Sequence, residues 1–222
     1  MHKSVKDILD KKKSGQKISV ITAYDYTLAS LCDKAGIDIM LVGDSAGMVM
    51  LGYENTIPVT MEQMILFTEA VSRARQNSLV VADMPFMSYQ ASTSDAIANS
   101  GRLIKAGADS VKLEGGKIVA PTIQAIVETG IPVMGHIGFQ PQTTTLAQGY
   151  RVQAKTKDAA LTLIEDAKAL EKAKTLAADV QPARPQRLGL AFDRHAGSPE
   201  RMLHLSLREQ TELVPLGAIV IF

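Results

Sequence analysis

The sequence predicts an α/β protein built on a parallel β-sheet, and two observations support this. First, apolar runs rich in β-forming residues recur through its first two-thirds with little polar alternation, as in strands buried on both faces. Second, helical patterns lie between these runs, and strands that alternate with helices form parallel sheets through right-handed crossovers. The runs are Ile18–Tyr24, Ile37–Val42, Leu79–Ala82, Ser110–Leu113 and Pro132–Gly135. A barrel and an open doubly wound sheet both fit this pattern.

The helical segments have recognisable starts. Thr60 and Gln63 have the spacing of a capping box and precede an apolar stripe. Between Ser94 and Lys105 the apolar residues fall on one helical face. Pro121 suits the first turn of a further helix, where its missing N–H is tolerated.

Glycines mark the ends of the helices. Gly36, Gly107 and Gly130 each follow a periodic segment, where glycine readily adopts the left-handed conformation that ends a helix. The junctions Lys34–Asp38 and Lys105–Asp109 are nearly identical, as expected of repeating β/α units. Five such units fit within residues 18–172.

Composition excludes several classes of function. A net charge of +1 gives no field for nucleic acid or anionic membranes, and 5% aromatic residues without tryptophan argue against a base-stacking surface. The one cysteine, Cys32, excludes an intrachain disulfide and is interpreted as a small buried hydrophobic residue. The polar N-terminus lacks a signal-peptide core, and no apolar run reaches the roughly 20 residues of a membrane span. We therefore expect a cytoplasmic protein.

Ionisable residues lie at or just after the carboxyl ends of four consecutive predicted strands. They are Asp44, Asp83, Lys112, Glu114 and His136. In a parallel α/β protein the carboxyl ends of the strands meet on one face, where active sites lie. The three carboxylates are hard oxygen ligands suited to Mg²⁺.

Each of these residues also has a plain structural interpretation. The aspartates could be helix caps or turn residues, Lys112 a solvated side chain, and His136 a packing residue. Their coincidence on one face favours a site, because burying so many ionisable groups without a charged partner is costly. A cation held there would chelate a 2-oxo acid, polarise its carbonyl and acidify the adjacent C–H, while Lys112 adds positive charge.

Longer strings around these residues are specific. They are Ile21–Tyr26, Leu41–Met48, Thr56–Thr60, Ala82–Phe86, Val111–Gly116, Gly135–Gly138, Pro141–Gln142 and Gly149–Tyr150. In this order and spacing they resemble the ketopantoate hydroxymethyltransferases, over about residues 15–172.

The resemblance implies a (β/α)₈ TIM barrel that transfers a hydroxymethyl group from 5,10-methylenetetrahydrofolate to 3-methyl-2-oxobutanoate in pantothenate biosynthesis, giving 2-dehydropantoate. It implies Mg²⁺ ligation by Asp44, Asp83 and Glu114. The oxo acid would be contacted by Asp44, Ser45, Asp83 and Lys112. It assigns no step to His136. Members of this family are usually homo-oligomers, often decamers, so small molecules and further copies of the chain are the expected partners.

The resemblance ends near Ala173, where Lys174 stands in place of the glycine due at a third junction. Thr175–Gln181 is predicted to be a poor strand and Pro182–Arg187 irregular, so strands six to eight are not recognisable. Residues 1–172 hold 14 Lys and 4 Arg, against 1 Lys and 5 Arg in residues 173–222. This shift divides the chain into a barrel domain, 1–172, and a divergent tail, 173–222.

The tail has two interpretations, a frameshifted or replaced segment and a genuine lineage-specific one. Its end, Leu213–Phe222, has the composition of a strand and also of an aggregation-prone segment. The resemblance places a proton-accepting glutamate on the sixth strand, but Glu200, Glu209 and Glu212 all lack its context. We therefore expect a metal and oxo-acid half-site with weak or no turnover.

Three functions stay open at this point. The first is the transferase. The second is another metal-dependent lyase or transferase acting on a 2-oxo acid in a related barrel. The third is a truncated, non-catalytic product that binds metal or oxo acid, or misfolds.

Overall fold

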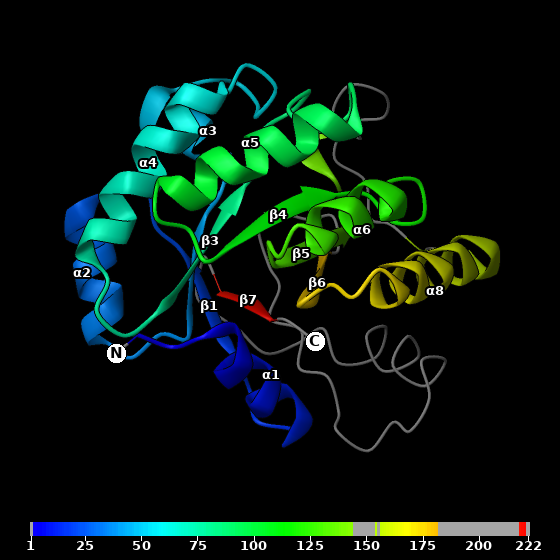
Figure 1. Cartoon of the computed structure of the whole chain (residues 1–222), viewed down its shortest axis with the longest axis horizontal. Helices are drawn as coiled ribbons and strands as arrows, with labels where there is room; N and C mark the ends of the chain where they lie inside the picture. The colour runs from blue at the N-terminus through cyan, green and yellow to red at the C-terminus, as the bar shows by residue number, and fades with distance from the viewer. Residues whose placement is uncertain (1, 144–153, 155, 182–217, 221–222) are drawn as a thin grey trace.

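A computed structural model describes residues 2–143, 154, 156–181 and 218–220 (Figure 1). Its sheet has seven strands in the order β6-β5-β4-β3-β2-β1-β7, with neighbours parallel except for the antiparallel pair β1–β7. The elements are α1 Val5–Lys13, β1 Ser19–Thr22, α2 Tyr26–Lys34, β2 Ile39–Val42, α3 Ala46–Leu51, α4 Met61–Ala74, β3 Leu79–Asp83, α5 Thr93–Lys105, β4 Ser110–Glu114, α6 Ala120–Glu128, β5 Val133–Gly138, α8 Lys157–Lys172, β6 Ala177–Gln181 and β7 Ala218–Val220.

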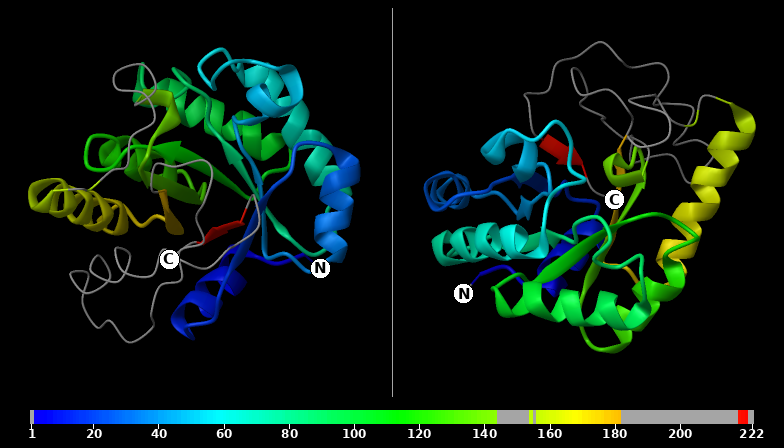
Figure 2. Two further views of the ribbon diagram at one scale, coloured as in Figure 1. Left: turned by 180° about the vertical axis from the view of Figure 1, so that it is seen from behind. Right: turned by 90° about the horizontal axis from the view of Figure 1, so that it is seen from above.

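The sheet curls into a half-barrel with helices on its outer side (Figures 1 and 2). Sequential parallel strands joined by helices produce this curvature. The curled sheet excludes the open doubly wound sheet. It agrees with the predicted barrel as far as the described strands extend. All five predicted strands are present, with ends shifted by up to three residues.

The inner face of the sheet is apolar near the amino ends of the strands. Val20, Leu41, Leu79 and Val81 pack there in one buried cluster, and Ile8 of α1 joins them and covers that end. A second cluster on the outer face packs the strands against the surrounding helices. The inner face therefore becomes polar only toward the carboxyl ends of the strands.

The local signals at the helix ends are confirmed. Thr60 and Gln63 form the reciprocal capping box of α4, and a proline lies in the first turn of α6. Gly36, Gly107 and Gly130 all have positive φ. Cys32 is buried, as expected.

Three features differ from expectation or add to it. The polar N-terminus forms helix α1, capped reciprocally by Ser4 and Asp7. The prediction of a poor strand at Thr175–Gln181 is wrong, because β6 forms there and pairs with β5 in parallel. Backbone pairing with the exposed edge of β5 outweighs the weak strand propensity of this segment. A strand at the chain end is also confirmed, by β7.

Other parts of the tail prediction lie outside the described residues. These are Pro182–Arg187 and the three glutamates, and the string Gly149–Tyr150 of the barrel domain also lies outside the described residues. Among the helices that are described, none combines the length and apolar character needed to cross a membrane.

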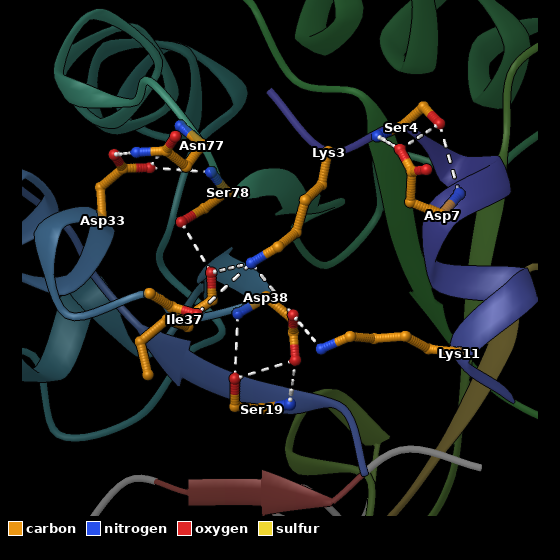
Figure 3. A network of polar contacts seen from close by, with 11 residues as sticks. Lys3, Ser4, Asp7, Lys11, Ser19, Asp33, Ile37, Asp38, Asn77 and Ser78 are labelled. Atoms are coloured by element: carbon orange, nitrogen blue, oxygen red, sulfur yellow. Dashed lines mark hydrogen bonds and ion pairs between the residues drawn. The ribbon is translucent and has the colours of Figure 1, made fainter. Parts of the chain in front are cut away.

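A polar network holds the amino ends of the strands together (Figure 3). Asp38 accepts hydrogen bonds from the backbone N–H of Ser19 at 2.9 Å and from the ammonium groups of Lys11 at 2.6 Å and Lys3 at 3.0 Å. Burial raises the pKa of Asp38, but these donors outweigh it and bring the pKa to about 2.

Two further aspartates act in the same way. Asp33 accepts the backbone N–H groups of Asn77 and Ser78 at 2.9 and 2.8 Å, just before β3 begins. Burial raises its pKa, but these bonds lower it to about 2. Asp109 accepts the N–H of Val80 at 2.8 Å. Each carboxylate thus satisfies backbone N–H groups just before a strand or in its first two residues.

Candidate active site

Strand register brings the predicted site residues together at the carboxyl end of the inner face. Asp83 of β3 is the direct partner of Lys112 of β4, and Glu114 is the direct partner of His136 of β5. Adjacent strands lie about 4.8 Å apart, so in-register side chains on one face touch. All four residues are no more than 5% exposed.

The Asp83 carboxylate is the centre of the first pair. Its Oδ1 accepts a 2.6 Å bond from the Lys112 ammonium, and its Oδ2 accepts the backbone N–H of Asp44 at 3.1 Å. Asp44 itself follows β2 and is 4% exposed. The hydroxyl of Ser45 lies 2.8 Å from that of Tyr24. The predicted oxo-acid residues are thus contiguous.

Two residues with no predicted role complete the network. Gln142 donates from Nε2 to Asp44 Oδ2 at 2.8 Å and to the Met84 carbonyl at 2.9 Å, and its backbone N–H donates to Glu114 Oε2 at 3.0 Å. The Tyr89 hydroxyl donates to Gln142 Oε1 at 2.8 Å. Gln142 lies in a string quoted for the resemblance, but no strand or helix pattern marks either residue as part of the site.

His136 is 1% exposed, and its Nδ1 lies 3.2 Å from Glu114 Oε1. Neither ring nitrogen makes a hydrogen bond to a described group, so the pair is a close approach rather than a hydrogen bond.

The charges at this site do not balance among the described residues. At the carboxyl end of the inner face, three carboxylates, those of Asp44, Asp83 and Glu114, lie with the single ammonium of Lys112. Burial, helped by the negative charge of Asp83, raises the pKa of Asp44 to about 7, although Lys112 and Gln142 oppose the shift. Burial also raises the pKa of Asp83, against the opposing charge of Lys112. The site therefore carries surplus negative charge that it stabilises poorly.

A divalent cation fits this donor set. Within the described ranges no three Asp, Glu, His or Cys side chains converge as a ready-made metal cage. Mg²⁺ does not require one, because it is usually held by one or two carboxylates, with water and substrate oxygens completing its shell. Asp44 and Asp83, joined through the Asp44 N–H, are the best-placed pair, and Glu114 is tied to Asp44 through Gln142.

The structure excludes the non-functional interpretations of Lys112 and of Asp44 as a helix cap. Lys112 is buried in an ion pair, so a solvated lysine is the wrong interpretation. Asp44 does not cap α3, whose N-cap is Ser45 without a side-chain bond. A packing role for His136 stays open. In the β5–β6 register Asp179 is the direct partner of His136.

The chain is closely similar to several curated proteins, each named 3-methyl-2-oxobutanoate hydroxymethyltransferase. It is 76% identical over 173 residues to the one from Nitrosopumilus maritimus (strain SCM1), which covers 78% of this chain and 62% of that protein. It is 62% identical over 161 residues to the one from Cenarchaeum symbiosum (strain A), covering 72% and 61%. The chain therefore matches about six-tenths of the length of these relatives.

Solved structures show the fold alone. A phosphonopyruvate hydrolase in complex with oxalate and Mg²⁺ is 12% identical with a TM-score of 0.63, covering 96% of this chain and 71% of that one. An oxaloacetate acetylhydrolase is 13% identical with a TM-score of 0.59, covering 93% and 70%. Both likenesses extend over nearly the whole chain.

A family model described as ketopantoate hydroxymethyltransferase matches residues 2–181. This match extends past residue 172 to the end of β6, so it includes the strand that propensity alone did not reveal. It also spans every residue of the carboxylate network described above. On the motifs, the network and this match together, the chain belongs to the ketopantoate hydroxymethyltransferase family.

Proposed function

We propose that this chain transfers a hydroxymethyl group from 5,10-methylenetetrahydrofolate to 3-methyl-2-oxobutanoate, giving 2-dehydropantoate for pantothenate and coenzyme A synthesis. Family membership and the names of the relatives support the reaction. The observation that carries the proposal is the buried Lys112–Asp83 pair beside Asp44 and Glu114. It is a charged, oxygen-rich mouth suited to a cation and an oxo acid.

The residues divide the work as follows. Asp44 and Asp83, with Glu114 as a third candidate, would hold Mg²⁺. When bound, Mg²⁺ polarises the keto group and stabilises the negative charge that develops as the neighbouring C–H bond breaks. Lys112 supplies positive charge to the oxo acid, and Ser45 offers it a hydroxyl. Burial of the three carboxylates and Lys112 excludes water and strengthens each electrostatic interaction.

The sequence offered no residue for the role of proton acceptor. We assign it to Asp179, on the ground that this residue is the direct partner of His136 in the β5–β6 register. The C3–H bond of 3-methyl-2-oxobutanoate breaks, its proton passes to Asp179, and its electron pair forms the new bond to the folate methylene carbon. Water then supplies the hydroxyl oxygen, and both bonds that held this carbon to folate nitrogens break. One nitrogen takes up the proton that water releases, and the other takes up the proton that Asp179 accepted.

A second candidate function is binding and enolisation of the oxo acid without transfer. The observation that favours it is the distribution of the network, since the carboxylates, Lys112 and Gln142 all lie between residues 44 and 142. Together with Asp179 as the proton acceptor, these residues supply what binding and enolisation of the oxo acid require. Cytoplasmic location and a homo-oligomer remain part of the proposal, as the usual setting of this family.

One experiment with two readouts separates these functions. Purified protein with Mg²⁺ is given 3-methyl-2-oxobutanoate in D₂O, and loss of the C3–H signal is followed by proton NMR. Transfer from methylenetetrahydrofolate is measured in parallel. Asp83→Ala is compared with Glu171→Ala, which removes an exposed carboxylate on α8.

Exchange and transfer that both disappear in Asp83→Ala, but not in Glu171→Ala, support the transferase. Exchange without transfer supports the second candidate. If the folded wild type shows neither, the proposed function is wrong. Asp179→Asn tests the acceptor separately, with an expected loss of at least 100-fold in exchange, in line with typical general-base contributions.

A further inference from the structure

We propose that Gln142 is a positioning residue that makes the site selective for Mg²⁺ over Ca²⁺. It does so by engaging one oxygen of Asp44 and one oxygen of Glu114, so that neither carboxylate can turn both oxygens toward a cation. The inference rests on the proposed function, because it concerns the cation that this function requires.

The contacts of Gln142 link three strands. Its amide reaches Asp44, which follows β2, and the carbonyl of Met84, which follows β3, while its backbone N–H reaches Glu114 at the end of β4. The residue is 1% exposed. A glutamine buried so completely, with both amide protons and its backbone N–H donated within the site, is held in a single orientation.

Tyr89 fixes which way the amide points. Its hydroxyl donates to Gln142 Oε1 at 2.8 Å, so the opposite end of the amide, Nε2, must face Asp44. Tyr89 is itself 2% exposed, and its hydroxyl also lies 3.1 Å from the backbone carbonyl and the backbone N–H of Glu114. The same tyrosine therefore sets both the amide and the strand that carries Glu114.

These bonds leave a defined oxygen on each carboxylate for a cation. Gln142 bonds Asp44 through Oδ2 and Glu114 through Oε2, so Oδ1 and Oε1 are the atoms that a cation can take without displacing it. Asp83 differs, because Lys112 bonds its Oδ1 and the Asp44 N–H bonds its Oδ2, so that each of its oxygens already accepts one bond. Asp44 and Glu114 are thereby directed toward single-oxygen coordination.

Single-oxygen coordination discriminates between the two cations. Mg²⁺ requires six ligands in a near-ideal octahedron at about 2.0–2.1 Å and is satisfied by one or two carboxylate oxygens with water. Ca²⁺ takes 6–8 oxygens at about 2.3–2.6 Å and often uses both oxygens of a carboxylate. A site whose carboxylates cannot open to bidentate coordination therefore penalises Ca²⁺ more than Mg²⁺.

The test is calorimetric titration of the purified full chain with MgCl₂ and, separately, with CaCl₂. Gln142→Met keeps the length of the side chain and removes its bonds to Asp44 and Met84, while the backbone bond to Glu114 stays. Tyr89→Phe removes only the hydroxyl that orients the amide, and serves as a milder second variant should Gln142→Met fold poorly. Gln124→Met is the matched control, since Gln124 is exposed on α6 and bonded to Glu128.

We expect Gln142→Met to tighten Ca²⁺ binding about 10-fold, because the second oxygen of Asp44 is released, while the Kd for Mg²⁺ changes less than threefold, so that the selectivity for Mg²⁺, the ratio of the two Kd values, falls. Such a fold-change corresponds to about 1.4 kcal/mol. Tyr89→Phe should shift the ratio in the same direction by about threefold, and Gln124→Met should leave it unchanged. A structural role alone would weaken both cations equally.

Several results overturn the inference. They are a parallel loss of both affinities, an unchanged ratio in Gln142→Met and Tyr89→Phe, and a wild type that prefers Ca²⁺ or binds neither cation. The proton-exchange assay keeps this outcome distinct from failure of the proposed function. A wild type that binds Mg²⁺ selectively but exchanges no C3 proton removes the function and leaves the role of Gln142 intact.

Discussion

The two ends of the sheet use the same residue type in opposite ways. At the amino end, Asp33 and Asp38 accept backbone N–H groups, with lysines added at Asp38, and both have pKa values near 2. At the carboxyl end the pKa of Asp44 is raised to about 7, and that of Asp83 is also raised. Buried aspartate stabilises one end of the molecule and costs free energy at the other.

The difference follows from the direction of the strands. The amino edge of a parallel sheet presents unpaired N–H groups, which a carboxylate satisfies well. The carboxyl edge presents carbonyl oxygens, which repel it, so donors must come from side chains such as Lys112 and Gln142. A carboxylate cluster at the carboxyl edge therefore has too few hydrogen-bond donors until a ligand supplies positive charge.

The largest expected effect comes from removing the positive charge of Lys112. Lys112→Met leaves Asp83 buried without its charge partner, and we expect a loss of about 3–5 kcal/mol in the free energy of unfolding. Urea denaturation measures it. The double variant Lys112→Met/Asp83→Asn should recover much of the loss. If the single variant is as stable as the wild type, the contrast between the two ends is wrong.

A change of opposite sign is expected at Asp44. Its pKa in the folded protein lies above its ordinary value of 3.8, so stability falls as pH rises from about 4 to about 7. Asp44→Asn should therefore raise the stability of the metal-free protein at pH 8 by on the order of 2 kcal/mol. The gain should vanish toward pH 4. Thermal melts over that range, with Glu171→Gln as control, decide the matter.

At the amino end the same substitution should destabilise. The folded pKa of Asp38 lies below 3.8, so its contribution is present above about pH 4 and is lost as pH falls toward 2. Asp38→Asn should cost about 1–2 kcal/mol at pH 7 and progressively less in acid. Asp38→Asn and Asp44→Asn that shift stability in the same direction at pH 8 would contradict the comparison.

The smallest effect is expected from Lys11→Met. Asp38 keeps Lys3 and the Ser19 N–H as partners, and Lys11 is about one-third exposed, so the loss should be about 0.5 kcal/mol. Urea unfolding at low and high salt measures it. A loss above 2 kcal/mol would show that Asp38 depends on one lysine rather than on a shared network.

Much of this arrangement could be predicted from the sequence. The apolar runs located five strands, and the ionisable residues that follow them gave Asp83, Lys112, Glu114 and His136, because strand direction alone determines which residues share an edge. The roles of those residues are still predictions.

The remainder depended on contacts that no local pattern encodes. Gln142 and Tyr89 join the site through side chains far apart in sequence, and β6 forms because β5 offers it an edge. Helix α1 could have been found, since Ser4 and Asp7 have capping-box spacing, although the third position is aspartate instead of the usual glutamate or glutamine.

The bond between Gln142 and Asp44 has a consequence for the order of folding. The two residues lie 98 positions apart, and β2, β3 and β4 must already be aligned before the bond can close. Contacts of such long range form late, and during synthesis the earlier strands emerge first. A nascent chain that has reached β3 would carry two of the acidic residues without the amide that limits their coordination. Discrimination between cations is thus acquired after the ability to attract them.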